Sequence, residues 1–95
     1  MRTSAENMAE ILFAAARRGH YPTLTQLINA KADVNVRDAA GRTAVMVAAF
    51  NGGPVSTQLL IDAKADIMAK QPDGTNALIW AVAGNFVNCV KVLVD

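Results

Sequence analysis

The residues that most often carry chemistry are few in this chain, and they lack the partners that chemistry requires. His20 is the only histidine and Cys89 the only cysteine, whereas a zinc site needs three or four converging Cys, His or acidic ligands. No His or Lys lies at a spacing from Cys89 that would activate its thiol. We therefore predict no metal site, no cofactor and no catalytic cysteine. His20 follows Gly19, and we interpret it as a turn residue whose ring bonds the backbone.

Two aspartates and a glycine pair also fall short of an active site. Asp33 and Asp66 could form a carboxylate pair for acid–base catalysis, but one full copy of a repeated segment separates them, so they recur for structural reasons. Gly52 and Gly53 precede Pro54 and belong to no phosphate-binding, dinucleotide-binding or nucleophile-elbow pattern. We therefore interpret them as a loop only. We predict that the chain is not an enzyme.

The repeated segment has a period of 33 residues. Residues 27–34 (Leu-Ile-Asn-Ala-Lys-Ala-Asp-Val) return as residues 60–67 (Leu-Ile-Asp-Ala-Lys-Ala-Asp-Ile), and six of the eight are identical. Such a period is typical of arrays in which each unit cannot bury its apolar face alone and stacks on its neighbours. Because the surface of such a stack is long and exposed, we predict an interaction module.

Arranged on this period, the chain is one domain, 1–95, of three units: an N-terminal capping repeat (1–40), a second repeat (41–73) and a partial third repeat (74–95). Each unit holds apolar residues at i, i+3 and i+4 in two places, which predicts two helices with one apolar face each. The first-helix set is Leu12, Ala15, Ala16, Val45, Ala48, Ala49, Leu78, Ala81 and Val82. The second-helix set is Leu24, Leu27, Ile28, Thr57, Leu60, Ile61, Val90, Leu93 and Val94.

Turn residues separate the two helices of each unit. Gly19, Gly52 and Asn85 recur at one position and tolerate left-handed backbone. Pro22 and Pro54 stand near the start of the second helix, where a missing N–H costs nothing. The two helices are therefore predicted to be antiparallel and joined by a short loop.

The segments between units, 32–41 and 65–74, are short and end in Ala-Gly and Asp-Gly turns. We interpret them as hairpin-like fingers. The polar groups at their tips would lack hydrogen-bond partners inside a helical stack, so we expect the tips to project into solvent.

Two stretches of sequence resemble a known motif. Residues 41–52 (Gly-Arg-Thr-Ala-Val-Met-Val-Ala-Ala-Phe-Asn-Gly) resemble the ankyrin motif G-x-T-P-L-H-x-A-A-x-x-G, and residues 32–35 resemble its A-D-V-N. The resemblance spans nearly the whole chain. It implies an all-α ankyrin-repeat solenoid of stacked antiparallel helix pairs with projecting hairpin-like loops. It also implies that the Asp38 carboxylate accepts N–H groups in a D-x-x-G turn.

The chain departs from that motif at two sets of positions. Phe13, Met46 and Ile79 replace its histidine, so we expect the hydrogen bonds of that histidine to be absent. Lys31 and Lys64 occupy a position that is usually glycine. If this position is left-handed, each lysine is strained by about 1 kcal/mol.

The two ends of the array differ. Thr3 and Glu6 could form a capping box, which suits an N-terminal capping unit. The third unit lacks its finger, which leaves an unfilled stacking face beside Cys89, Val90, Leu93 and Val94. We infer either a C-terminally shortened fragment of a longer array or a face that another protein or a second copy covers.

The composition excludes several classes of protein. Hydrophobic residues make up 53% of the chain and charged residues 18%, which excludes general disorder. The net charge of +1 provides no overall field for nucleic acid or anionic lipid. The longest uncharged apolar runs, 44–50 and 77–83, are far shorter than the roughly 20 residues of a membrane-spanning helix. A single cysteine favours a reducing, cytoplasmic setting.

The resemblance implies a concave recognition surface of finger tips and exposed first-helix ends. Phe50 is the candidate exposed anchor, and Trp80 is expected to be half buried between first helices. The surface comprises Arg17, Arg18, Arg37, Arg42, Phe50, Asn51, Lys70, Thr75 and Ala83, and all but Ala83 are predicted to bind a partner protein. Its basic residues favour an acidic or mixed partner. The alternative is a solvated set of charges without a single partner.

Nucleic-acid binding is disfavoured, because no stacking platform or recognition helix accompanies the charges.

Overall fold

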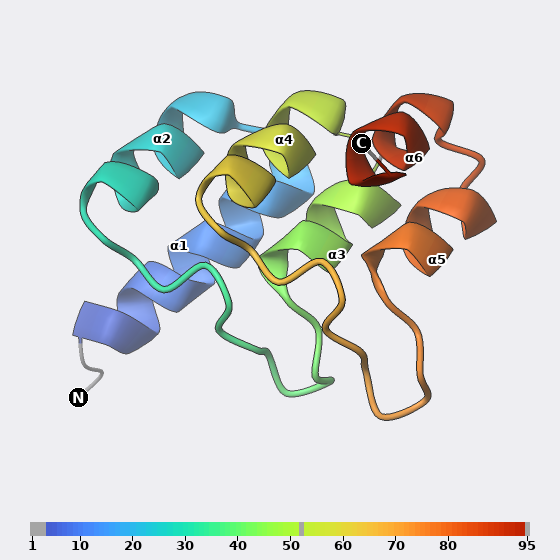
Figure 1. Cartoon of the computed structure of the whole chain (residues 1–95). Coiled ribbons are helices and arrows are strands. Elements are labelled where there is room, and N and C mark those ends of the chain that lie inside the picture. The colour runs from blue at the N-terminus through green and yellow to red at the C-terminus, as the bar shows by residue number, and fades with distance from the viewer. Residues whose placement is uncertain (1–3, 52, 95) are drawn as a thin grey trace.

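Six helices account for the regular structure of residues 4–51 and 53–94, the part of the chain that the computed structural model describes, and these ranges contain no strand. The helices are α1 (Ser4–Arg18), α2 (Tyr21–Asn29), α3 (Ala44–Phe50), α4 (Pro54–Asp62), α5 (Ala77–Ala83) and α6 (Val87–Val94). Helices α1, α3 and α5 form one layer, and α2, α4 and α6 form the other (Figure 1). The predicted all-α stack of helix pairs is confirmed.

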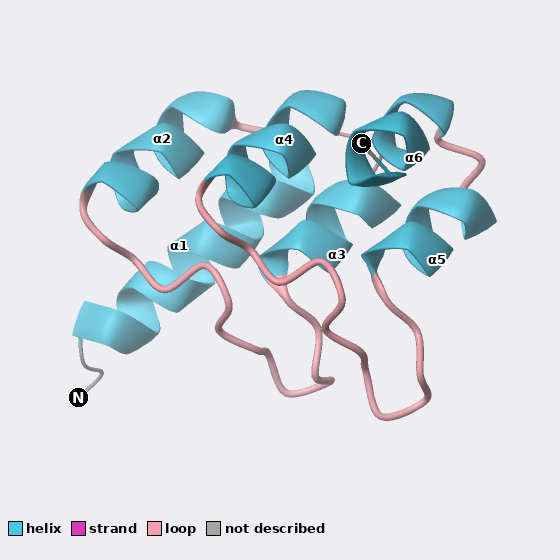
Figure 2. Cartoon of the chain, in the orientation of Figure 1, coloured by secondary structure: helices cyan, strands magenta, loops and turns pink. Residues whose placement is uncertain are grey.

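The loops between the pairs project past the layer of α1, α3 and α5 as two fingers (Figure 2). Each finger closes on a hydrogen-bonded turn. The N–H of Asp38 donates to the carbonyl of Arg42 at 3.0 Å, and the N–H of Gln71 donates to that of Thr75 at 2.8 Å. The fingers are thus hairpin-like, as predicted, although no strand forms in either.

Left-handed residues end the helices where the sequence predicts them. Lys31 and Lys64 have φ angles of 65° and 72°, so both lysines carry the expected strain. Gly19 and Asn85, which occupy the same position two repeats apart, have φ angles of 66° and 57°. The predicted equivalent at Gly52 lies outside the described residues, as does Thr3 of the predicted capping box.

The N-termini of α3 and α5 are capped by side chains at different positions of the repeat. Asn76 caps α5, because its Oδ1 accepts the N–H of Ile79 at 2.9 Å. At α3 the N–H of Thr43 donates to the Sδ of Met46 at 3.5 Å. Met46 is expected to lack the hydrogen bonds of the motif histidine that it replaces. This expectation is only partly right, because the Met46 thioether still accepts one hydrogen bond, although it is a weak acceptor.

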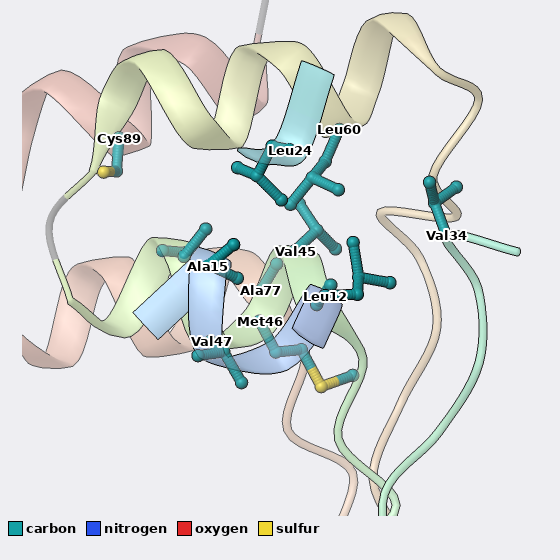
Figure 3. Packing of buried hydrophobic residues seen from close by; sticks show 14 of the residues in the cluster. Leu12, Ala15, Leu24, Val34, Val45, Met46, Val47, Leu60, Ala77 and Cys89 are labelled. Atoms are coloured by element: carbon teal, nitrogen blue, oxygen red, sulfur yellow. The ribbon is translucent and has the colours of Figure 1, made fainter. Parts of the chain in front are cut away.

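The core lies between the two layers. Leu24 and Leu60 from the second helices meet Val45 of α3 there (Figure 3), and all three are buried. Ala48 and Ala81, at the middle of the first-helix faces, are completely buried. Their small side chains allow α3 to pack closely against α1 and α5.

The third repeat departs from the predicted core pattern at two valines. Val82 is 59% exposed, whereas Ala49, at the same position of the second repeat, is 0% exposed. Val94 is likewise 63% exposed. In the first two repeats these positions are covered by the following repeat, and the described residues supply no such cover for the third.

The prediction that Cys89 and Leu93 also border this open face is wrong. Both are buried in the hydrophobic core, because α6 packs against α4 and α5. Val90 is half buried. Among the described residues, no helix is both long enough and apolar enough to cross a membrane.

Candidate functional site

A cavity of about 150 Å³ opens between the end of α1, α3, α5 and the base of the first finger. We call it the Phe50 cavity. Its walls combine apolar and aromatic side chains with two guanidinium groups and one amide. It is lined by Arg17, Arg42, Met46, Val47, Phe50, Asn51 and Trp80. Four of these residues, Arg17, Arg42, Phe50 and Asn51, are among those predicted to bind a partner.

Two aromatic rings form one wall of the Phe50 cavity. Phe50 and Trp80 meet edge to face, with ring centroids 4.8 Å apart and planes at 73°, an arrangement that aromatic pairs favour. Phe50 is 49% exposed and Trp80 is partly buried. The expected environments of both rings are therefore confirmed.

The second finger holds the indole of Trp80 in place. Its Nε1–H donates to Oε1 of Gln71 at 2.6 Å, and the same oxygen accepts the hydroxyl of Thr75 at 2.9 Å. Thr75 also bonds Asp73, through its backbone N–H and its side chain. These two hydrogen bonds from Thr75 lower the pKa of the Asp73 carboxyl. Thr75, predicted to bind a partner, is thus engaged inside its own finger.

Arg42 forms an ion pair with Asp38, at 2.8 Å between Nε and Oδ2. Oδ1 of Asp38 accepts the backbone N–H groups of Ala40 and Arg42 at 3.0 and 2.9 Å, as the D-x-x-G turn predicts. Partial burial alone would raise the pKa of the Asp38 carboxyl. The hydrogen bonds from Arg42, the positive charge of Arg42 and the hydrogen bond from the Ala40 N–H together outweigh this effect, so the pKa of Asp38 is lowered. Asp38 is therefore ionised at neutral pH and offsets the charge of Arg42.

Other predicted basic residues lie outside the Phe50 cavity. Arg37 donates to the backbone oxygens of Lys70 at 2.7 Å and Gly41 at 3.0 Å, so its guanidinium ties the two fingers together. Lys70 is exposed in the second finger. Arg18 lines a different hollow, which includes His20 and Thr23. The structure therefore does not gather all the predicted basic residues into one patch.

Arg17 is the basic residue of the Phe50 cavity that keeps its charge uncompensated. It is exposed in the last turn of α1, and its guanidinium forms no hydrogen bond or ion pair with another described residue. It occupies the same position of the first repeat that Phe50 occupies in the second. A cation and an aromatic ring thus lie in consecutive repeats on one surface.

Comparison with known proteins decides the family. A family model described as ankyrin repeats (3 copies) matches residues 12–95. The chain belongs to the ankyrin repeat family. Ankyrin repeats are generally protein–protein interaction modules and are typically not catalytic.

Several ankyrin-repeat relatives match most of this chain. It is 37% identical over 83 residues to a probable E3 ubiquitin-protein ligase, XBOS33, of Oryza sativa subsp. japonica, and 34% identical over 84 residues to M-phase phosphoprotein 8 of Homo sapiens. It is 31% identical over 94 residues to the ankyrin repeat domain-containing protein SAT10 of Stachybotrys chartarum. These matches cover 86%, 86% and 99% of this chain but only 16%, 10% and 5% of the relatives. The similarity therefore concerns the repeats alone.

Trp80 is the main residue of this ankyrin-repeat site that the predicted set omitted. Trp80 occupies the position of the third repeat that Val47 occupies in the second, and Val47 lies one helical turn before Phe50. The Trp80 ring therefore reaches the Phe50 ring on the neighbouring helix. That spacing of one repeat less one turn is visible in the sequence and could have placed the two rings together. The bond from Trp80 to Gln71 had no such signal, because it depends on how the finger folds back.

Cys89 and His20 take structural places in the ankyrin fold. Cys89 is buried, and burial raises the pKa of its thiol despite an opposing contact with Thr57. His20 bonds the hydroxyl of Thr23 at 2.7 Å through Nδ1, rather than a backbone group as predicted, because its ring lies over the first turn of α2. The described residues contain no cluster of three or more His, Cys, Asp or Glu side chains that could hold a metal ion.

Proposed function

We propose that this chain binds a partner protein and that the Phe50 cavity is its principal contact. The observation that carries this proposal is the Phe50 ring, half exposed and fixed edge to face against Trp80. Exposed, rigid aromatic side chains beside a cavity are frequent centres of binding energy in protein interfaces. The other cavity residues, Arg17, Arg42 and Asn51, would contribute polar contacts around them.

The size and chemistry of the cavity favour a protein over other ligands. Small-molecule sites usually enclose about 300–1,000 Å³, whereas the Phe50 cavity holds about 150 Å³, which suits a single side chain of a larger partner. Nucleic acid is disfavoured, since Asp38 compensates Arg42 and the charge of Arg37 is engaged between the fingers. We also propose a cytoplasmic setting, because the chain has one cysteine and that residue is buried.

Arg18, Arg37, Lys70 and Thr75 remain predicted contacts on which this proposal does not depend. Arg37 and Thr75 bond within the fingers. Lys70 and Arg18 lie outside the cavity lining. A partner larger than one side chain could still reach them.

The test is a selection of binders from a displayed library of random peptides, followed by measurement of the enriched peptides on two variants. Phe50→Asp changes the cavity, and Val55→Asp changes an equally exposed valine (56%) on α4 in the opposite layer. We expect Phe50→Asp to weaken binding about tenfold or more and Val55→Asp to leave it unchanged. Binding that withstands Phe50→Asp, or that is lost only in Val55→Asp, would overturn the proposal.

A second candidate function is association through the open face of the third repeat. The exposure of Val82, at a position that is buried in the first two repeats, favours it. Sedimentation velocity tests it with Val82→Glu, which alters an exposed residue; a charge at the buried Leu93 would unfold the chain instead. Dimers that dissociate in Val82→Glu but persist in Val55→Glu would support association. A wild-type chain that stays monomeric would exclude it.

A further inference from the structure

We propose that the Phe50 cavity selects a specific side-chain pair in its partner: an apolar residue that enters the cavity and a neighbouring Asp or Glu whose carboxylate binds Arg17. This specificity rests on the proposed function, because it defines the partner chemistry of the same site. It goes further, because the ankyrin fold alone does not determine what its surface recognises.

The hydrogen-bonding groups of the cavity belong to Arg17, Arg42 and Asn51, and the rest of its lining is apolar or already hydrogen-bonded. The indole N–H of Trp80 is already donated to Gln71, and one of the two amide N–H groups of Asn51 is donated to the carbonyl of Val47 at 2.8 Å. The walls away from Arg17, Arg42 and Asn51 are formed by the Phe50 and Trp80 rings, Met46 and Val47. A polar group placed there would lose its hydration without replacement, which costs free energy. An apolar side chain avoids that loss.

The charge beside the cavity specifies the second residue of the pair. The lining contains two guanidinium groups and no carboxylate. Asp38 compensates Arg42 through its ion pair, so Arg17 supplies the net positive charge. A guanidinium binds a carboxylate with two parallel hydrogen bonds. A cationic side chain at the same place would be repelled by Arg17.

The repeat sets the order of the two subsites. Arg17, Phe50 and Ala83 occupy equivalent positions of the three repeats, so the stack arranges a cation, an aromatic ring and a small residue in that order from α1 to α5. A partner segment that crosses the first helices from α1 toward α5 thus meets Arg17 before Phe50. The acidic residue of the partner should lie on the α1 side of the apolar residue.

The test uses peptides enriched from the random display library and resynthesised with each acidic residue changed to Gln or to Lys. Binding is followed by the indole N–H signal of Trp80, the only tryptophan. Arg17→Gln should weaken binding of an acidic peptide by about three- to tenfold, because the contact is partly exposed. Arg17→Gln should not change the affinity for the peptide in which Gln replaces the acidic residue. Lys91→Gln, a change at an exposed basic residue of α6 in the opposite layer, is the matched control and should change neither.

The outcomes separate this proposal from the one on which it rests. Enriched peptides that lose binding in Phe50→Asp but carry no acidic residue, or that bind Arg17→Gln as tightly as wild type, would overturn the acidic–apolar specificity and leave the proposed function standing. Peptides in which Lys replaces the acid without loss would overturn it as well. Peptides insensitive to Phe50→Asp would overturn both.

Discussion

The guanidinium of Arg37 lies 2.7 Å from the backbone oxygen of Lys70, a residue at the same position of the next repeat. The same nitrogen of Arg37 also donates to Gly41 within its own finger. A side chain that looks suited to partner binding thus joins the two fingers. Because the first finger contributes Arg42 to the Phe50 cavity and the second holds Trp80 through Gln71, this bond helps to hold the shape of the recognition surface.

Arg37→Gln should therefore lower the free energy of unfolding by about 1 kcal/mol, since an exposed hydrogen bond to a charged group is lost. Urea unfolding monitored by circular dichroism measures it. Lys70→Gln is the control, because it retains the backbone oxygen and should leave stability within about 0.5 kcal/mol of wild type. Equal losses in the two variants would contradict the bond between the fingers.

Asn35 links consecutive repeats through both ends of its amide. Its Oδ1 accepts the N–H of Asp66 at 2.7 Å, and its Nδ2 donates to the carbonyl of Lys64 at 3.3 Å. Asn35→Ala should lower the free energy of unfolding by about 1–2 kcal/mol. Met68, the equivalent residue of the second repeat, is 68% exposed, so Met68→Ala should have almost no effect. A larger loss from Met68→Ala would argue against this link.

Lys31 and Lys64 should each be improved by glycine. Their φ angles of 65° and 72° strain any residue with a Cβ atom, so Lys31→Gly and Lys64→Gly should each raise stability by up to about 1 kcal/mol. Ala30, one residue before Lys31, has a φ of −82°. Thermal unfolding measures these changes. Ala30→Gly should give no gain, and a gain equal to that of Lys31→Gly would count against the strain.

The Asp38–Arg42 pair should make stability depend on acid pH. The pKa of Asp38 is lower in the folded chain than the usual value of about 3.9. Its stabilisation is therefore complete above that usual value and is lost as the pH falls through the lower, folded value. Asp38→Asn should destabilise the chain at pH 7 by about 0.5–1 kcal/mol, and the difference from wild type should shrink in stronger acid. Thermal unfolding at several pH values measures it, and a constant difference would refute this role.

The sequence predicts the stack because its 33-residue period places alanines and leucines on repeated faces. Ala48, Leu60 and the left-handed Lys64 are found where the pattern requires them. The residue pattern that predicts these features is contained within one repeat, so each copy of the motif predicts them separately.

Other features depend on neighbours and leave no such signal. Val82 fits the apolar pattern as well as Ala49 does, yet its burial requires a following repeat against it. The bond from Arg37 to Lys70 requires two fingers to run side by side. Of the predicted site, Arg17, Arg42, Phe50 and Asn51 converge, because they recur on the same face of the first helices and at the finger base.

Binding of a partner in the Phe50 cavity is tested most directly by NMR, with the amide and indole signals of the chain followed as a library-selected peptide is added. We expect the indole N–H of Trp80 and the amides of Arg17, Phe50 and Asn51 to shift, while those of Val55 and Gln58 in the opposite layer stay in place. Shifts confined to α4 and α6, with the Trp80 signal unmoved, would contradict it.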